Sequence, residues 1–340
     1  MKIIRSRAPL RIGFSGGGSD LKVYSEKYGG AVINATISLY VYCNITVTGS
    51  NKIIFESIDG KLKNENKVSQ YIKHDGNLDI FKAVYNKIHN KFSPEIFGFH
   101  LSTYSEVPVG SGLGGSSTLV VSIITAFIKL YKLSLNKYQI AKLAFEIERE
   151  DMKIIGGQQD QYASVFGGFN FIKFNKNKSV EVNSLNLKTA IINELESSMV
   201  LFYTNIKRNA GQIEKEKSYL IKKNESIQAM HDVKKTAVQM KDYLIKGNIA
   251  KVAKLTDLSW EAKKSVSKLV SNSRIDKIYQ SAIHCGAMGG KISGAGGGGF
   301  MFFYIKPEEK FNLINLLNKE KGYVINFKFS KEGAFAWYSQ

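Results

Sequence analysis

The sequence predicts a two-domain protein that mixes β-strands and α-helices. The chain has 340 residues, which is long for a single hydrophobic core. Segments with strand composition and segments with helical spacing both occur along it, without an internal repeat. The stretch at 175–190 is polar and rich in Asn and Lys, as expected at a domain boundary. We therefore expect one domain at residues 1–185 and a second at residues 186–340.

Composition restricts where the protein works. Its hydrophobic content of 44% and charged content of 23% are ordinary for a globular protein. Cys43 and Cys285 are too few for a disulfide framework or a Cys-x-x-Cys metal site, which favours a reducing compartment. The N-terminus reaches Pro9 before any apolar signal-peptide core, and the longest apolar stretch, Leu119–Ile128, is too short to span a bilayer. We expect a cytoplasmic protein without membrane contact.

The net charge of +19 fits either a nucleic-acid binder or an enzyme that handles several phosphates. The lysines are scattered, however, and basic residues do not interleave with aromatic ones as they do in RNA-binding proteins. We interpret the charge as a lysine-rich solvated surface and expect no nucleic-acid partner. A basic nucleic-acid binder stays open as an alternative that rests on charge alone.

The first hundred residues predict mainly strands. A glycine loop, Ser15–Asp20, lies between Arg11 and Asp20, so both charges can face one polar ligand; a hairpin turn with a surface ion pair is the alternative. Residue types and spacing predict a strand broken at Pro9, a strand–turn–strand unit, a helix and a further strand, at residues 3–14, 31–55, 78–89 and 98–107 respectively.

The segment from Pro108 to Ser117 is the strongest functional signal. Its glycines allow positive φ and let backbone N–H groups approach a ligand, while Ser116, Ser117 and Thr118 stand where a helix N-cap belongs. A glycine loop that opens a helix is an anion site, because unpaired N–H groups and the positive end of the helix dipole coincide there. We expect a phosphate-binding loop made by Pro108, Gly110, Ser111, Gly112, Leu113, Gly114, Gly115, Ser116 and Ser117.

Look-alike loops are excluded by what is missing around this one. The Gly-x-Gly-x-x-Gly string at Gly110–Gly115 matches a dinucleotide fingerprint, but no acidic residue occurs between Glu106 and Glu146 to bind a ribose. No Lys-Ser or Lys-Thr pair ends the loop, so it is not a Walker P-loop. The His-Arg-Asp and Asp-Phe-Gly motifs of protein kinases are absent as well.

A predicted helix at 135–152 ends in four acidic residues. Acids oppose the dipole at a helix C-terminus, and such a mismatch is tolerated if one acid holds a cation; a solvated acidic end is the alternative. A glycine-flanked turn at 156–163 carries a lone acid, Asp160, and a strand follows at 166–174. The acids in the last turn are Glu146, Glu148, Glu150 and Asp151.

The second half predicts a short strand at 198–203, charged helices within 211–284, a helix at 311–317 and strand-like residues at 324–337. A third glycine loop, Gly289–Gly299, leads into a strand at 300–305. Because that loop feeds a strand, its glycines are expected to permit close packing or backbone approach.

Taken together, the three glycine loops resemble, in order and spacing, the three motifs of the GHMP small-molecule kinases, which include galactokinase, homoserine kinase and mevalonate kinase. The resemblance covers nearly the whole chain. It implies an α+β fold with two domains, the first like domain 2 of ribosomal protein S5 and the second ferredoxin-like, with the active site between them. It also implies ATP and Mg²⁺ as cofactors.

The resemblance implies roles for individual residues. The second loop would wrap the ATP phosphates, and Ser117 and Glu148 would bind Mg²⁺, with Glu146 a weaker choice than Glu148. Asp160 would accept the proton of the attacking hydroxyl, and Arg11 would stabilise its charge. The substrate would contact the first and third loops at Gly16, Gly17, Gly18, Ser19, Asp20, Gly294, Gly296 and Gly297.

The first loop departs from galactokinase, where Gly-Glu-His-x-Asp stands in place of Ser-Gly-Gly-Gly-Ser-Asp. Its glycine-rich form resembles the branch that contains the D-glycero-D-manno-heptose 7-phosphate 1-kinases and the kinase domain of fucokinase. This branch implies transfer of phosphate from ATP to the anomeric hydroxyl of a sugar phosphate, for nucleotide-activated heptose and surface polysaccharide synthesis. Arg208, in a loop after the strand at 198–203, is the arginine expected to contact the far phosphate, with a solvated loop arginine as the alternative.

Other readings stay open. Another sugar-1-kinase, fucokinase-like or galactokinase-like, is the alternative within the family, and a non-catalytic sugar-binding regulator is the alternative from another class. Such a regulator would be expected to lack the acids at the positions of Glu148 and Asp160, and both are present. The sequence leaves the oligomeric state open, with a homodimer among the possibilities.

Overall fold

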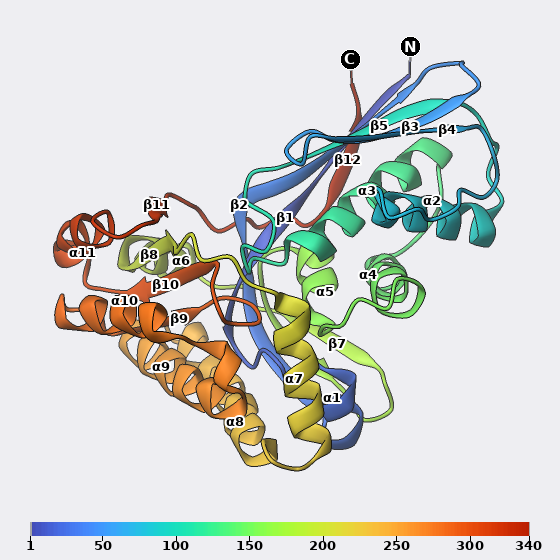
Figure 1. The fold of residues 1–340 in the computed structure, drawn as a ribbon. Coiled ribbons are helices and arrows are strands. Elements are labelled where there is room, and N and C mark those ends of the chain that lie inside the picture. Colours follow the sequence, from blue (N-terminus) through green and yellow to red (C-terminus); the bar gives the residue numbers. More distant parts are fainter. Residues whose placement is uncertain (1, 340) are drawn as a thin grey trace.

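The computed structural model describes residues 2–339, which form two β-sheets with helices packed against them (Figure 1). Within this range the larger sheet has eight strands and the smaller has four. Strands β1 (Ile3–Ser15) and β2 (Gly30–Val47) run the length of the larger sheet. The last residues of β1 and the first residues of β2 lie beside the smaller sheet. The glycine loop that follows β1 therefore lies where the two halves of the molecule meet.

The larger sheet has the strand order β12-β1-β2-β5-β3-β4, and β6 and β7 branch from β2. Neighbouring strands are antiparallel except for the pair β3 and β5. The length of β2 lets it pair with β6 along its first part and with β5 along its second. The other strands are β3 (Lys52–Ser57), β4 (Leu62–Lys67), β5 (Phe99–Ser105), β6 (Phe169–Phe174), β7 (Val180–Ser184) and β12 (Phe335–Tyr338).

Helices cover one face of this sheet and form a hydrophobic core with it. Val121, Ile124 and Phe127 of α3 are buried in the same cluster as Ile45 of β2 and Leu101 of β5. Burying side chains of this size contributes about 1.5–3 kcal/mol each. The helices of this layer are α2 (Asp79–Phe92), α3 (Gly115–Tyr131), α4 (Lys137–Phe145) and α5 (Gln159–Phe166).

The smaller sheet is antiparallel, with the order β11-β8-β10-β9. In chain order this is 4-1-3-2, the ferredoxin-like arrangement that the resemblance implied, so the expected α+β fold class is confirmed. Its strands are β8 (Met199–Tyr203), β9 (Gly289–Ile292), β10 (Phe300–Tyr304) and β11 (Tyr323–Ile325).

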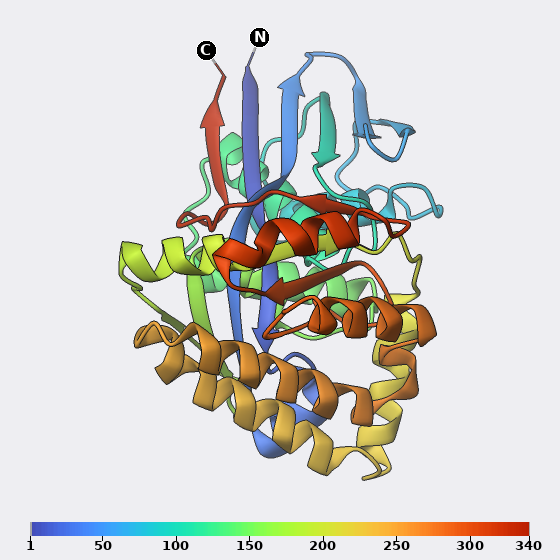
Figure 2. The same cartoon turned by 90° about the vertical axis from the view of Figure 1, so that its left-hand side faces the viewer.

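Two long antiparallel helices, α8 (Ile227–Ile245) and α9 (Ile249–Val266), lie side by side against this sheet and the first part of β2 (Figure 2). The remaining helices are α1 (Lys22–Tyr28), α6 (Thr189–Ser198), α7 (Ala210–Lys222), α10 (Ser273–His284) and α11 (Lys310–Leu317), with short 3₁₀ turns at Lys268–Val270 and Pro307–Glu309. Within residues 2–339, no helix combines the length and apolar character needed to cross a bilayer.

The predicted strand break at Pro9 is wrong. β1 continues through Pro9, and only its register against β2 shifts, between Pro9 and Arg11 and again between Gly13 and Ser15. A register shift absorbs a proline without ending the strand, because the missing N–H falls at an irregular point of the ladder.

The predicted N-cap at Ser116–Thr118 is also wrong. α3 begins at Gly115, with Gly114 at the N-cap in the left-handed region at φ 80°. A methyl group on Gly114 would lie 3.3 Å from the Asp160 carboxyl group, so this position combines unusual backbone with close approach. The hydroxyls of Ser116 and Ser117 therefore lie in the first helical turn instead of capping it.

The region around 135–166 differs from expectation in two places. The predicted helix at 135–152 is α4 followed by a π-helical turn at Glu146–Asp151, which carries the acids. The predicted glycine-flanked turn at 156–163 is half helix, because α5 starts at Gln159 and places Asp160 in its first turn. The strand expected from 166 begins only at Phe169.

The strand-like residues predicted at 324–337 divide between the two sheets. β11 belongs to the smaller sheet, whereas β12 pairs with β1 in the larger one, with Arg5 opposite Trp337. The chain therefore returns to the first sheet after completing the second. The domain boundary at 185/186 stays a prediction.

Candidate active site

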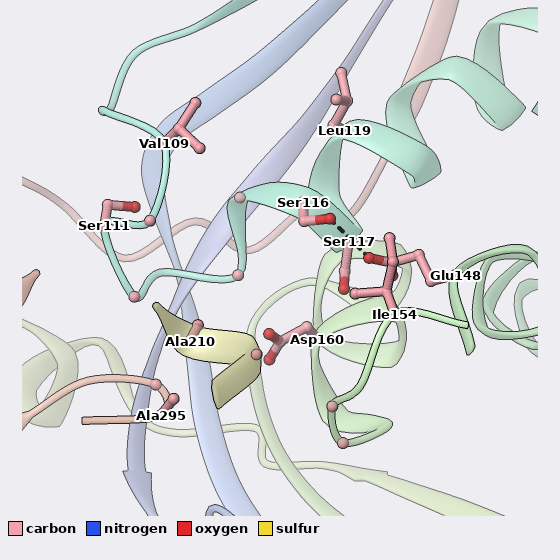
Figure 3. Close-up of a pocket in the computed structure, with 18 of the residues that line it drawn as sticks. Val109, Ser111, Ser116, Ser117, Leu119, Glu148, Ile154, Asp160, Ala210 and Ala295 are labelled. Carbon is pink, nitrogen blue, oxygen red and sulfur yellow. Dashed lines mark hydrogen bonds between the residues drawn. The ribbon is translucent and has the colours of Figure 1, made fainter. Parts of the chain in front are cut away.

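A cavity of about 390 Å³ lies where the three glycine loops meet (Figure 3). Asp160 projects toward its middle, with the phosphate-binding loop and α3 on one side and Ala210 and Ala295 across from them. The predicted site residues that line it are Arg11, Gly17, Gly18, Asp20, Pro108, Gly110, Ser111, Gly112, Gly114, Gly115, Ser116, Ser117, Glu148, Asp160, Arg208 and Gly294.

The structure joins Arg11 of β1 to Asp160 of α5. The Arg11 Nε and Nη2 atoms lie 2.8 and 2.6 Å from the same oxygen, Oδ1 of Asp160. The Arg11 side chain is only 4% exposed, whereas that of Asp160 is 21% exposed. The second carboxylate oxygen, Oδ2, is therefore the one left to face a ligand.

Arg11 also fixes the other two loops around this pair. Its Nη1 donates to the Gly112 carbonyl at 2.6 Å, and lies 3.5 Å from the Ser293 hydroxyl. Its backbone N–H donates to the Leu113 carbonyl at 3.0 Å. One buried guanidinium thus joins the first strand, the phosphate-binding loop and the start of the third glycine loop.

Asp20 is buried and acts as a cap for α5. Its Oδ2 accepts from the backbone N–H groups of Gln158 and Gln159 at 2.9 and 3.0 Å, and its Oδ1 accepts from Gly18 N–H at 2.9 Å. Burial raises the pKa of Asp20, and the Gly18 and Gln159 backbone hydrogen bonds oppose that shift. Although Asp20 borders the cavity, this carboxylate holds the turn that presents Asp160.

The four acids that end the 137–151 helical segment have different surroundings. Glu146 and Asp151 both pair with Lys87, at 3.6 and 3.0 Å, and Glu150 pairs with Lys22 at 2.9 Å. Glu148 alone among them is fully buried, and its Oε1 accepts from the Ser116 hydroxyl at 2.8 Å (Figure 3). The structure therefore brings Glu148, and not Glu146, to the phosphate-binding loop.

Gln161 joins Glu148 to Ser117 and was missed by the sequence analysis. Its Nε2 lies 2.5 Å from Glu148 Oε2 and 3.0 Å from Ser117 Oγ, while its buried Oε1 has no hydrogen-bond partner among the described residues. The carboxylate and the hydroxyl thus converge on one point, as two oxygen ligands of a hard cation would. The Gln-Gln-Asp-Gln run gave no sign of which amide turns inward.

All but one of the predicted phosphate-binding residues line the cavity, and their role toward a phosphate stays a prediction. Leu113 is the exception, because its side chain is buried in the core. The Ser111 hydroxyl is buried and has no hydrogen-bond partner within residues 2–339, so a ligand oxygen would satisfy it.

The other two glycine loops contribute only some of their predicted residues. Gly17 and Gly18 border the cavity, but the Ser19 hydroxyl is buried against the Gly16 and Ala31 carbonyls. A methyl group on Gly16 would lie 2.0 Å from the Ala31 oxygen, so that glycine serves close packing.

In the third loop, Gly294 and its neighbour Ala295 border the cavity. Gly296 and Gly297 do not, because they pack against Val270 and Ile213.

Arg208 spans the second and third loops. Its Nε donates to the Gly110 carbonyl at 3.0 Å, and its Nη1 lies 2.5 Å from the Gly296 carbonyl. Burial, reinforced by nearby Arg11, lowers the pKa of Arg208 to about 10. This arginine is inside the site, but two of its N–H groups are already used to join loops.

Known proteins resemble this chain along its whole length. The models for the N-terminal and C-terminal domains of GHMP kinases match residues 79–168 and 240–321. The D-glycero-alpha-D-manno-heptose 7-phosphate kinase of Campylobacter jejuni is 50% identical over 337 residues, which cover 99% of each chain. The chain belongs to the GHMP kinase family.

Two further relatives place this GHMP kinase among sugar kinases. The crystal structure of a D-glycero-D-manno-heptose 1-phosphate kinase from Bacteroides thetaiotaomicron is 40% identical, with a TM-score of 0.85 and 98% of each chain covered. The bifunctional fucokinase/GDP-fucose pyrophosphorylase of Arabidopsis thaliana is 27% identical over 89% of this chain, but over only 30% of its own length. This GHMP kinase is accordingly a sugar kinase that depends on ATP.

Proposed function

We propose that this GHMP kinase transfers the γ-phosphoryl group of ATP to the anomeric hydroxyl of D-glycero-D-manno-heptose 7-phosphate, forming the 1,7-bisphosphate. One observation supports the chemistry above all others: Asp160 lies directly beneath the phosphate-binding loop, 3.3 Å from the position of a methyl group on Gly114. The proposed proton acceptor, Asp160, is thus in close proximity to the loop that would bind the phosphates of ATP. The choice of acceptor rests on the relative with 50% identity.

The ATP side of the cavity is the side with the phosphate-binding loop. Backbone N–H groups of the loop and the N-terminus of α3 would bind the phosphates. Six apolar side chains also line the cavity and would contact a purine base: Val41, Val107, Val109, Leu119, Ile154 and Ile155.

Ser117 and Glu148 would hold Mg²⁺. Their oxygens converge on the Gln161 amide, and Mg²⁺ commonly takes one or two carboxylates with phosphate oxygens completing its shell. Within residues 2–339 no three His, Cys, Asp or Glu side chains gather as an all-protein metal cage, which agrees with a cation shared with a nucleotide. When bound, the ion would neutralise charge on the transferring phosphoryl group.

The protein's own part in the reaction follows from the Arg11–Asp160 pair. The acceptor oxygen forms a bond to the γ-phosphorus while the bond from that phosphorus to the β–γ bridging oxygen breaks and ADP leaves. The hydroxyl proton passes to Asp160 Oδ2, because Oδ1 is held by Arg11. Proton acceptance by a positioned group contributes about 10²–10⁴-fold to the rate.

A kinase assay across hexoses, heptoses and their phosphates tests the proposal. We expect the highest kcat/KM with the heptose 7-phosphate and little turnover of the unphosphorylated heptose. Comparable turnover of unphosphorylated heptose, fucose or galactose would contradict the proposal and favour another sugar-1-kinase.

A further inference from the structure

Three buried lysines lie behind the first and third glycine loops, and the catalytic steps above do not use them. Lys217 of α7, Lys263 of α9 and Lys291 of β9 are 1%, 2% and 2% exposed. Lysine is seldom this buried without a paired charge, because removing an ammonium group from water is costly. Their surroundings therefore require an explanation.

Too few carboxylates lie near these lysines to neutralise their charge. Lys217 lies 3.0 Å from Glu214, but within residues 2–339 neither Lys263 nor Lys291 forms an ion pair. Among the described residues, Arg208 has no carboxylate within ion-pair distance either. Taken as one group, five cationic side chains face three carboxylates: Arg11, Arg208, Lys217, Lys263 and Lys291 against Asp20, Asp160 and Glu214.

The excess positive charge acts on the lysines themselves. Burial, with the charges of Arg11 and Lys217 added, lowers the pKa of Lys291 to about 7. Burial, with Lys217 and Lys291 nearby, lowers the pKa of Lys263 well below its usual range, and Glu214 only partly opposes this. An anion at this place would relieve the repulsion.

The lysines also set the direction of the third loop. Lys263 donates to the Gly294 carbonyl, and Lys217 donates to the Ala295 carbonyl at 2.7 Å. The N–H groups of Gly294 and Ala295 have no acceptor among the described residues. Both residues border the cavity, so these N–H groups are available to a ligand bound there.

The opposite wall of this part of the cavity is the first glycine loop. A methyl group on Gly17 would lie 3.4 Å from Gln159 Nε2 and 3.9 Å from Lys263 Nζ. Glycine at this position therefore leaves the space through which a ligand can approach the ammonium group. This space adjoins Gln159, whereas the phosphate-binding loop meets the next residue, Asp160, at Gly114. A phosphate here would belong to the acceptor and not to ATP.

We propose that the phosphate at the far end of the acceptor binds between Gly17 and Ala295, with Lys263 and Lys217 as its counter-ions. This inference rests on the proposed function, since it requires an acceptor that is already phosphorylated. A phosphate dianion supplies the negative charge that the group lacks, and the Gly294 and Ala295 N–H groups donate to its oxygens. Lys291 adds to the field without needing direct contact.

The test compares two acceptors, the heptose 7-phosphate and the unphosphorylated heptose, in full-length Lys263→Met and Lys217→Met variants. Methionine keeps most of the buried stem and removes the ammonium group, together with its hydrogen bond to the Gly294 or Ala295 carbonyl. We expect KM for the phosphorylated acceptor to rise roughly ten- to a hundredfold, the scale of a lost charged hydrogen bond. The weak turnover of unphosphorylated heptose, and KM for ATP, should hardly change.

Lys82→Met is the matched control. Lys82, on α2, is also fully buried, but it pairs with Asp75 at 2.5 Å and does not line the cavity. Removing its charge should lower thermal stability and leave both KM values for acceptors unchanged.

The possible outcomes separate the two proposals. The wild type can prefer the phosphorylated acceptor while each variant changes KM equally for the two acceptors, or changes KM for neither. In that case the lysine site is wrong and the proposed function stands. If the wild type prefers an unphosphorylated sugar, the proposed function fails first. Because Lys217 and Lys263 come from different helices, the test does not depend on one variant folding.

Discussion

The two sides of the cavity differ in how their buried charges are paired. On the side of the phosphate-binding loop, the charges are balanced: Arg11 pairs with Asp160, and Glu148 is satisfied by Ser116 and Gln161. On the opposite side, behind the first and third glycine loops, the buried ammonium groups of Lys217, Lys263 and Lys291 donate to backbone carbonyls. Lys217 alone among these lysines also has a carboxylate partner, Glu214.

This difference reflects what each wall would bind. A nucleotide brings its own cation, so its wall needs only neutral N–H donors and one or two acidic ligands. A sugar phosphate brings no counter-ion, so the protein itself has to provide cationic side chains. These side chains stay buried without a paired anion when no sugar phosphate is bound.

Asp160→Asn should have the largest effect. The asparagine keeps the size of the side chain but cannot accept the hydroxyl proton, so we expect kcat to fall by about 10²-fold or more. ATP affinity, measured by isothermal titration, should stay near the wild-type value because the phosphate-binding loop is untouched. Near-normal turnover would remove Asp160 from proton transfer.

The balanced wall also predicts a metal effect of intermediate size. Ser117→Ala and Glu148→Gln should each raise the Mg²⁺ concentration for half-maximal rate by about tenfold, because each removes one protein oxygen from the ion. Glu146→Gln is the control, since Glu146 pairs with Lys87 and does not line the cavity. A titration in which Glu146→Gln shows the effect and Glu148→Gln does not would reverse the assignment.

The smallest effect should appear as a pH dependence of stability. The pKa of Lys291 is about 7 in the folded protein and higher when unfolded, so the unfolded state binds more protons above pH 7. Stability of the ligand-free wild type should therefore rise by about 2 kcal/mol from pH 7 to pH 9, or about 4 °C in Tm. Calorimetry of Lys291→Met should show a smaller rise, because this titrating group is removed. An identical rise would contradict the buried-charge account.

The sequence predicted the parts of the site that depend on local pattern. The three glycine loops are visible as local motifs. The roles of Arg11 and Asp160 and the choice of Glu148 over Glu146 were implied by the family resemblance, and the structure places Arg11 beside Asp160 and Glu148 beside Ser116. The start of α5 at Gln159 was not predictable, because the carboxylate that caps it, Asp20, lies far away in the chain. The helix propensity of the residues around Gln159 does not indicate a cap that comes from a distant part of the chain.

The lysines of the positively charged wall were out of reach for a similar reason. The chain contains 48 lysines and arginines. Lys217, Lys263 and Lys291 lie on two helices and a strand, and no sequence pattern relates their positions. Only the packing of α7, α9 and β9 shows that these three are buried together. Arg208 was predicted from its loop position, and its use in joining two glycine loops needed the fold to be seen.

The return of β12 to the first sheet bears on how the protein is made. β1 has β2 on one side and β12 on the other, so one edge of β1 stays open until residues 335–338 leave the ribosome. Open strand edges invite pairing with other chains. The first domain to be synthesised is therefore the last to be completed, and a nascent chain stalled anywhere in the second domain still carries an unpaired edge at its beginning.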